Sequence, residues 1–133
     1  MKNFKFYSIF LIAAVSFSLT FCSSTTSSPG ETVVKAYDLI KANQAKKVVA
    51  MYVSDKGEKL SGDEAKKMES IVPMAIEQWD GKDGLKKVEV TEEIIAEDGN
   101  SAKIKFTVHF NNGETDNEKA DLINMDGKWL IKL

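Results

Sequence analysis

After residue 28 the chain has an apolar position at every third or fourth residue, a pattern that predicts amphipathic helices. Ser28-Pro29-Gly30-Glu31 is typical of a helix start, because Ser suits the N-cap, Pro the first turn and Glu a capping box. We expect Asn43 to interrupt this helix and a short second helix to follow over residues 45–52. The apolar stripe of the first helix consists of Val33, Ala36, Tyr37 and Ile40.

A third predicted helix begins at Ser61-Gly62-Asp63-Glu64, which repeats the capping signature, and ends in a turn over residues 80–84. Pro73 lies inside this segment. Because Pro has no backbone N–H, we expect the helix to be kinked or split near Glu69. The apolar face of the helix consists of Ala65, Met68, Val72, Ala75, Ile76 and Trp79, with Ile71 at its margin.

From Leu85 onward, apolar and polar residues alternate, which predicts strands. The clearest strand, residues 103–110, places Ile104, Phe106, Val108 and Phe110 on one side. An Asn-Gly turn over residues 111–113 predicts a hairpin to a strand over residues 115–125. The last strand, residues 128–133, puts Trp129, Ile131 and Leu133 on one side and Leu130 on the other, against a neighbouring element.

Helices followed by a meander of strands predict an α+β fold. We expect two to three N-terminal helices packed on a curved, roughly four-stranded antiparallel sheet. The folded domain is predicted over residues 31–133, about 103 residues, enough for one hydrophobic core.

Residues 1–21 have the pattern of an export signal. Lys2 and Lys5 give a positive start, and residues 6–21 are almost wholly apolar. As a helix this apolar run would span about 24 Å, less than the roughly 30 Å of a bilayer core. The alternative interpretation is a permanent N-terminal anchor helix.

Cys22 is the single cysteine and the candidate site of lipid attachment. Leu19-Thr20-Phe21-Cys22 resembles the lipobox of bacterial lipoproteins, although Phe21 stands where a small residue is usual. A diacylglyceryl thioether on Cys22 together with an amide-linked acyl chain such as palmitate would give multiple-chain anchoring, which is stable where one chain is marginal. Residues 22–30 would then be a lipidated tether. The alternative is ordinary signal cleavage after Ser18, leaving a free thiol.

Composition narrows the possible functions. All 18 basic residues are Lys. Without Lys2 and Lys5 the chain has 16 basic and 20 acidic residues, so its net charge is about −4. A nucleic-acid binder usually gathers positive charge and uses Arg, so we expect no nucleic-acid binding. One cysteine cannot form an intrachain disulfide, and the sequence has no metal-ligand spacing or phosphate-binding loop, so no metal or cofactor is expected.

His109 is the only histidine. By alternation it shares a side with Lys103, Lys105 and Thr107, so we expect a solvated or cross-strand polar role. Glu92 has the parity of Val90, so an unbroken strand would turn its carboxylate inward, at a cost in free energy. The favoured alternative is a β-bulge at Glu92-Glu93, which resets the register and puts Ile95 inward.

Four residues are candidates for lining a ligand pocket: Tyr37, Trp79, Glu92 and Phe106. Tyr37 lies on the apolar stripe of the first helix, so we expect a core role with its hydroxyl at the rim, and Trp79 is expected first as a buried anchor. Asp38, next to Tyr37, and Glu92 are the acidic residues that an enzyme working in this fold would use as a base.

Ala45 to Tyr52, Asn112-Gly113 and Gly127-Lys128-Trp129 carry a resemblance to a known family. Over residues 29–133 the chain resembles the nuclear transport factor 2-like (cystatin-like) cone, and more narrowly the small bacterial lipoproteins of the domain of unknown function numbered 4878. The resemblance implies the fold far more than the activity, because this superfamily includes isomerases, dehydratases, transport factors and inactive interaction modules.

The sequence therefore predicts an exported, membrane-tethered lipoprotein of the cell envelope, on the inner or the outer membrane. We expect a non-catalytic module that binds another envelope protein or a small apolar ligand. The alternative is an isomerase- or dehydratase-like enzyme acting within the cone. An enclosed pocket with two converging polar side chains would favour the enzyme, and a cone plugged by Tyr37, Trp79 and Phe106 would favour the binding module.

Overall fold

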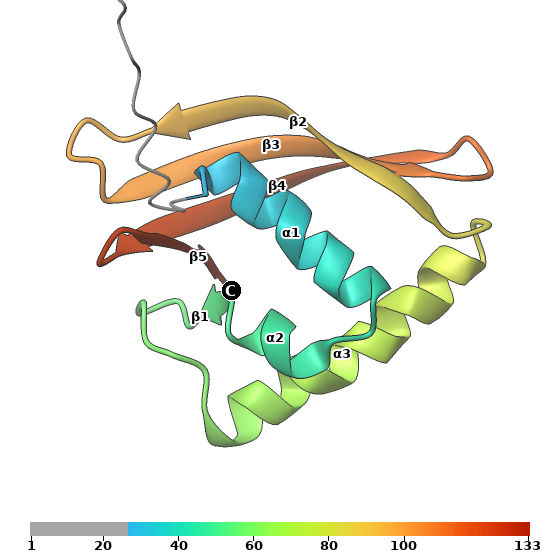
Figure 1. The fold of residues 1–133 in the computed structure, drawn as a ribbon, viewed down its shortest axis with the longest axis horizontal. Helices are drawn as coiled ribbons and strands as arrows, with labels where there is room; N and C mark the ends of the chain where they lie inside the picture. The colour runs from blue at the N-terminus through green and yellow to red at the C-terminus, as the bar shows by residue number, and fades with distance from the viewer. Residues whose placement is uncertain (1–26) are drawn as a thin grey trace, which may run out of the picture.

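The structure, a computed structural model, describes residues 27–133. The predicted export signal and the lipobox around Cys22 lie outside the described residues. Within residues 27–133, three helices lie on one side of a five-stranded sheet whose strand order is β1-β5-β4-β3-β2 (Figure 1). The elements are α1 (Pro29–Lys41), α2 (Ala45–Val49), β1 (Tyr52–Val53), α3 (Gly62–Asp80), β2 (Leu85–Ile95), β3 (Ser101–Phe110), β4 (Thr115–Met125) and β5 (Lys128–Lys132).

The predicted capping box at the start of α1 is confirmed. The Ser28 hydroxyl accepts a hydrogen bond from the Glu31 backbone N–H at 3.1 Å, and the Glu31 carboxylate accepts one from the Ser28 N–H at 2.9 Å. The helix begins at Pro29, two residues before the domain boundary expected at residue 31. It ends just before Asn43, which has a positive φ of 55°.

Two other helix predictions are wrong in detail. The second helix stops at Val49, and Tyr52 lies in β1 instead of at the helix end. α3 is one continuous helix that contains Pro73, so it is not split there; the alternative expectation of a kink stays a prediction. Ser61 occupies the N-cap of α3, but its side chain makes no capping hydrogen bond. Within residues 27–133, none of the helices is both long enough and apolar enough to cross a membrane.

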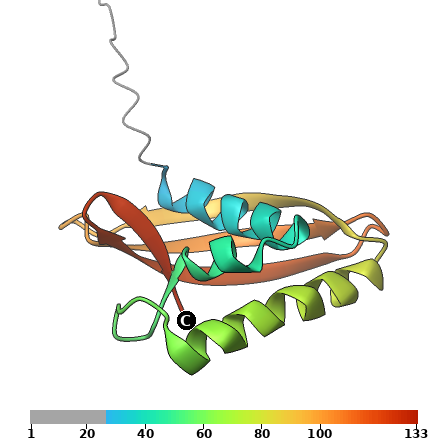
Figure 2. The same cartoon turned by 60° about the horizontal axis from the view of Figure 1, so that its bottom comes forward.

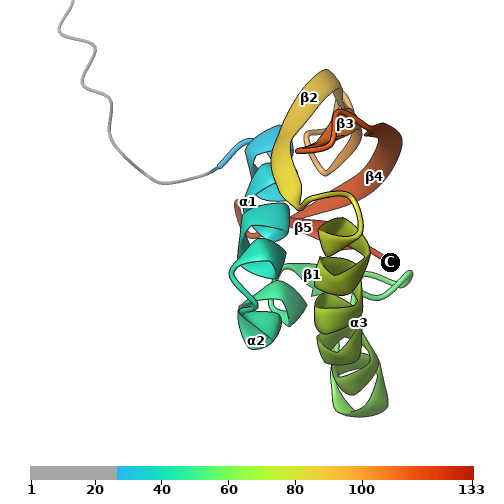
Figure 3. The same cartoon turned by 90° about the vertical axis from the view of Figure 1, so that its right-hand side faces the viewer.

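The predicted meander is confirmed: β2, β3, β4 and β5 pair antiparallel in chain order. The fifth strand was not predicted. β1 pairs parallel to β5, with Tyr52 opposite Ile131, so the sheet is mixed. The sheet coils strongly, and α1 and α3 lie in its concave side (Figures 2 and 3).

The hydrophobic core lies between α1 and the concave face of β3. Along β3 every second side chain is buried, as the alternation predicts. Val33 and Ala36 of α1 pack against this row. Leu130 is also buried, on the side of β5 opposite Ile131, so both faces of β5 are covered. The buried side chains of β3 are Ala102, Ile104, Phe106, Val108 and Phe110.

Candidate functional site

Three aromatic side chains fill the inside of the cone. The Tyr37 ring stacks on the Trp79 ring, with centroids 5.7 Å apart and planes inclined by 15°. The edge of Phe106 meets Tyr37 at 5.5 Å and 72°. Tyr37 comes from α1, Trp79 from the end of α3 and Phe106 from the middle of β3, so the three elements converge on Tyr37. Such offset and edge-on contacts are the arrangements that aromatic rings prefer.

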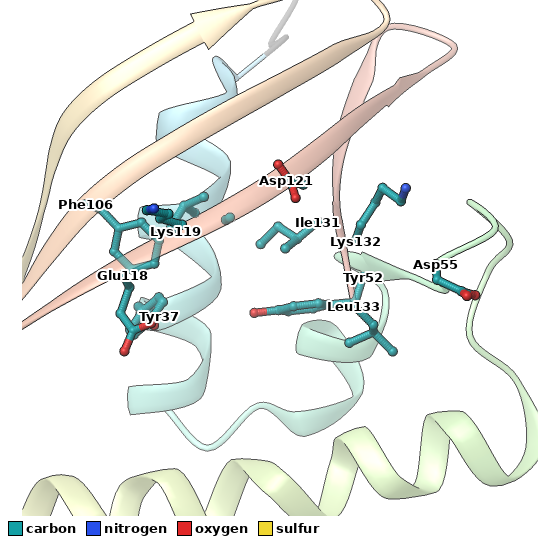
Figure 4. A pocket seen from close by; sticks show the side chains of 12 residues that line it. Tyr37, Tyr52, Asp55, Phe106, Glu118, Lys119, Asp121, Ile131, Lys132 and Leu133 are labelled. Atoms are coloured by element: carbon teal, nitrogen blue, oxygen red, sulfur yellow. The ribbon is translucent and has the colours of Figure 1, made fainter.

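Beside this cluster lies a hollow of about 400 Å³, which we call the tyrosine hollow. Val33, Phe106 and Ile131 form its apolar floor, and Tyr37 and Tyr52 stand at its sides. Figure 4 shows the Tyr52 ring reaching across the hollow in the direction of Tyr37. The remaining lining comes from Asp55, Glu118, Lys119, Ala120, Asp121, Lys132 and Leu133.

Neither tyrosine hydroxyl of the hollow has a hydrogen-bond partner among the described residues, and neither is fully enclosed. Burial raises the pKa of the Tyr37 phenol above its ordinary value, and repulsion from the Tyr52 phenolate, where that group ionises, and from the Glu118 and Asp116 carboxylates raises it further. Burial also raises the pKa of Tyr52. Both groups are therefore neutral phenols at physiological pH, free to donate and accept hydrogen bonds and poor as general bases.

Acidic side chains stand on the otherwise apolar concave face of β4. Asp116 pairs with Val108, and Glu118 with Phe106, so both follow the inward parity of β3. Glu118 reaches the tyrosine hollow, as Figure 4 shows. Asp116 is held 2.8 Å from the ammonium of Lys82, which also lies 4.3 Å above the Phe110 ring. Glu118 is therefore the carboxylate of this pair that remains open to a ligand.

A β-bulge is present in β2, but at Thr91, just before the predicted Glu92-Glu93 position, and it removes Glu92 from the pocket candidates. The pairing shifts between Val90 and Glu92, so that Thr91 is the extra residue. Glu92 then lies opposite Lys105 on the convex face and forms an ion pair with it at 2.7 Å. Ile95 takes the side of Ala102, as expected, although it stays half exposed.

The other candidate groups also lie away from the tyrosine hollow. Nε2 of His109 is 3.0 Å from the Glu89 carboxylate on the neighbouring strand, which is the expected cross-strand polar role. Asp38 is exposed and lines a different hollow, beside Val90. Among residues 27–133 there is no group of three or more His, Cys, Asp or Glu side chains placed to hold a metal ion.

Of the predicted pocket residues, Tyr37 and Phe106 line the tyrosine hollow, Trp79 stacks on Tyr37 without lining it, and Glu92 lies outside. The structure adds Tyr52 and Glu118. Glu118 had a signal in the sequence, because the Asn112-Gly113 hairpin fixes the register of residues 115–125 and gives position 118 inward parity. No signal in the sequence marked Tyr52 as a residue of the hollow, since β1 has only two residues and so shows no periodic pattern.

A family model described as "Domain of unknown function (DUF4878)" matches residues 20–132. The matched range includes Cys22 and nearly all of the described domain. A comparison with curated proteins found no match.

Among solved structures, the chain is similar to a Campylobacter jejuni protein provisionally named an NTF2-like transpeptidase. The two are 25% identical, the match covers 80% of this chain and 99% of that one, and the TM-score is 0.67. The protein Aln2 from a Streptomyces species is 18% identical over 77% of this chain and 85% of its own, at a TM-score of 0.39. A designed protein with a curved β-sheet gives 15% identity, 77% and 93% coverage and a TM-score of 0.45. The first of these likenesses confirms the predicted nuclear transport factor 2-like fold.

Proposed function

We propose that this chain, which belongs to the family described as Domain of unknown function (DUF4878), is a lipid-anchored binding module of the cell envelope. In this proposal the tyrosine hollow takes a small, largely apolar ligand that carries at least one hydrogen-bonding group. The observation that supports it is the pair of phenol hydroxyls, Tyr37 and Tyr52, which meet no hydrogen-bond partner within the described residues.

The shape and chemistry of the hollow favour a small ligand. Its volume of about 400 Å³ falls in the range of small-molecule sites, roughly 300–1,000 Å³. The floor of Val33, Phe106 and Ile131 offers apolar contact, and the two phenols with Glu118 offer a few oriented polar groups. That combination is typical of a binding site in which apolar contact supplies affinity and polar groups supply orientation.

Polar groups do converge on the hollow, but it is partly open to solvent, and the packed rings of Tyr37, Trp79 and Phe106 are the arrangement expected of a binding module. The chemistry of the lining groups argues for binding as well. A transpeptidase needs a nucleophile such as Ser or Cys, and no Ser, Thr or Cys lines the hollow within the described residues. The two acids expected to serve as bases, Asp38 and Glu92, lie outside it. The phenols of Tyr37 and Tyr52 hold their protons more tightly than usual, which makes them poor bases.

The binding arm of the proposal is tested by fluorescence titration of Trp79, which stacks on Tyr37 and so reports on the hollow. In a Trp129→Phe background the emission of Trp79 is the only tryptophan signal. The probe is the amphiphilic dye anilinonaphthalene sulfonate, which joins an apolar ring system to a sulfonate that accepts hydrogen bonds. Tyr37→Phe and Tyr52→Phe should each weaken its binding about three- to ten-fold, the equivalent of one hydrogen bond.

Thr107→Val is the matched control, because it removes an exposed hydroxyl on the convex face that bonds Asn117 instead of facing the hollow. It should leave the affinity of the dye unchanged. Equal affinities for all three variants and the parent would reject the tyrosine hollow as the binding site.

The anchoring arm of the proposal concerns Cys22. In cells grown with labelled palmitate the full chain should carry the label and float with membranes, whereas Cys22→Ala should do neither. Ser23→Ala, the neighbouring change, should behave like the parent. An unlabelled parent chain would end the lipoprotein proposal and leave the binding arm standing.

A further inference from the structure

A face rich in lysine surrounds the start of the domain. It is formed by α1, α2, the loop after β1 and the turn between β4 and β5, which lie together on one side in Figure 1. Two adjoining hollows of about 450 and 580 Å³ run along it and share Ala50, Asp126 and Lys128. We call it the lysine face, and its basic members are Lys35, Lys46, Lys47, Lys59 and Lys128.

The charge on this face is opposite in sign to that of the chain. The whole chain has a net charge of −2, yet Asp126 is the only acidic residue that lines the two hollows. All five lysines are exposed, and none forms an ion pair within the described residues. Glu31, four residues before Lys35, is engaged by the Ser28 backbone N–H. The lysines of this face therefore lack direct ion-pair partners within the described residues, although Lys35 also lines a hollow with Glu31, Asp38 and Glu93.

Apolar side chains lie between the lysines. Trp129 and Met51 line the larger hollow next to Lys47, and Val49 and Leu60 line the smaller one next to Lys46. Trp129 packs only partly against the core, so part of its ring stays accessible. Lysines mixed with tryptophan and aliphatic side chains are the composition that favours a membrane–water interface.

The face also lies where the chain enters the domain. Ser27, the first described residue, lines the larger hollow together with Lys35 and Trp129. Cys22 is five residues earlier, so the chain between them spans at most roughly 18 Å. A lipid on Cys22 would hold Ser27, and with it the adjoining edge of the lysine face, close to the bilayer. Among the described residues, none lines both the larger hollow and the tyrosine hollow, and Tyr52 alone lines both the smaller hollow and the tyrosine hollow.

We propose that the lysine face docks on the anionic headgroups of the membrane that anchors the chain. The inference rests on the proposed lipid anchor at Cys22. Docking orients the domain, because the tether and the lysine face then fix the membrane side, and the tyrosine hollow, which shares only Tyr52 with the lining of that face, stays open to the aqueous side. The occupant is a phospholipid surface carrying negative charge.

The test uses the full, lipidated chain reconstituted into two kinds of vesicle. One kind contains phosphatidylcholine alone, and in the other a third of the lipid is phosphatidylglycerol; both carry brominated acyl chains that quench nearby tryptophan. A Trp79→Phe version reports on Trp129 alone. We expect stronger quenching of Trp129 in the anionic vesicles, and the difference should vanish in about 1 M salt, where the Debye length is about 3 Å.

The variant Lys35→Gln/Lys47→Gln/Lys128→Gln should reduce the quenching in anionic vesicles about two-fold or more, because each lysine near such a surface contributes a roughly five-fold factor to docking. The matched control, Lys66→Gln/Lys86→Gln/Lys103→Gln, removes the same charge from lysines that are exposed elsewhere on the domain. In this control variant the brominated lipid should quench Trp129 as strongly as in the parent.

The outcomes separate the two proposals. A chain that does not float with vesicles of either kind lacks the anchor, which contradicts the proposed function. A chain that floats, but whose Trp129 is quenched equally in both vesicle types or equally in both triple variants, is anchored without docking, which overturns the present inference alone.

Discussion

The Oε1 atom of Glu93 lies 2.9 Å from the backbone nitrogen of Gly30, 63 residues earlier in the chain. A carboxylate from β2 thus satisfies a free N–H in the first turn of α1, where the helix dipole favours negative charge. The bulge at Thr91 makes this contact possible, because it turns Glu93 to the concave side and Glu92 to the convex side. Gly30 suits the close approach, since a Cβ there would come within 3.3 Å of the Val90 methyl groups.

Replacing Glu93 should therefore destabilise the domain more than replacing its neighbour. We expect Glu93→Ala to cost about 1–2 kcal/mol of unfolding free energy, the usual value of a charge-assisted cap. Glu92→Ala removes an exposed ion pair with Lys105 and should cost about 0–1 kcal/mol. Urea unfolding followed by circular dichroism measures both, and equal losses would show that the contact to Gly30 adds no stability.

The bulge itself can be tested by deletion. Val90 pairs with Phe106 and Glu92 with Lys105, which are consecutive on β3, so removing Thr91 leaves every pair and every face unchanged. The variant should fold. Its free energy of unfolding should fall by about 0.5–1.5 kcal/mol, because the hydrogen bond from the Thr91 hydroxyl to the Lys105 carbonyl is lost.

Deletion of Thr107 is the contrasting case. It removes a residue from the unbroken β3 and would turn half of the buried row to the convex face, because a one-residue slip reverses every side chain. No cooperative unfolding transition is expected for this variant. A folded Thr107 deletion, or an unfolded Thr91 deletion, would contradict this register of β2 and β3.

The sequence was sufficient for the features that depend on neighbours in the chain. Alternation alone identified the buried side of β3 and the outward place of His109, and the Glu92-Glu93 pair, which breaks the alternation of β2, indicated the bulge. The capping box at Ser28 has both partners within three residues, so it too was visible.

Features that depend on distant residues were not predictable in this way. The Glu93–Gly30 contact needs the curvature of the sheet to bring β2 over the start of α1. Tyr52 was assigned to a helix because β1 is formed only through pairing with Ile131, near the end of the chain. The tyrosine hollow was therefore only partly foreseen: Tyr37 and Phe106 have local patterns, and Tyr52 acquires its role from the tertiary fold.

The raised pKa values of Tyr37 and Tyr52 predict a loss of stability at alkaline pH. Below about pH 10, the ordinary pKa of tyrosine, both the folded and the unfolded chain carry neutral phenols. The full contribution of these two groups to the free energy of unfolding is present there. Above it the unfolded chain releases protons first, because the pKa is higher in the folded state, so the free energy of unfolding falls.

Phenylalanine at either position removes this titration. The drop in urea-unfolding free energy between pH 8 and about pH 11 should be smaller for Tyr37→Phe and for Tyr52→Phe than for the parent, and smallest for the double variant. Lysines such as Lys82, whose pKa is raised by the hydrogen bond to Asp116, contribute equally to all four chains. If the unfolding free energy falls with pH equally in the parent and the three variants, neither phenol is held neutral by the fold.

The edge contact between Phe106 and Tyr37 predicts that two similar core changes have different optical effects. Phe106→Leu and Phe110→Leu each shorten a buried side chain of β3 and should cost about 1–2 kcal/mol. Phe106 holds the Tyr37 ring against Trp79, whereas Phe110 packs beneath Lys82. Only the first variant should therefore weaken the near-ultraviolet circular dichroism of the Tyr37–Trp79 stack. Equal near-ultraviolet spectra for the two variants would show that the Tyr37–Trp79 stack stays ordered without Phe106. Tyr37 would then keep its place beside the tyrosine hollow when Phe106 is replaced.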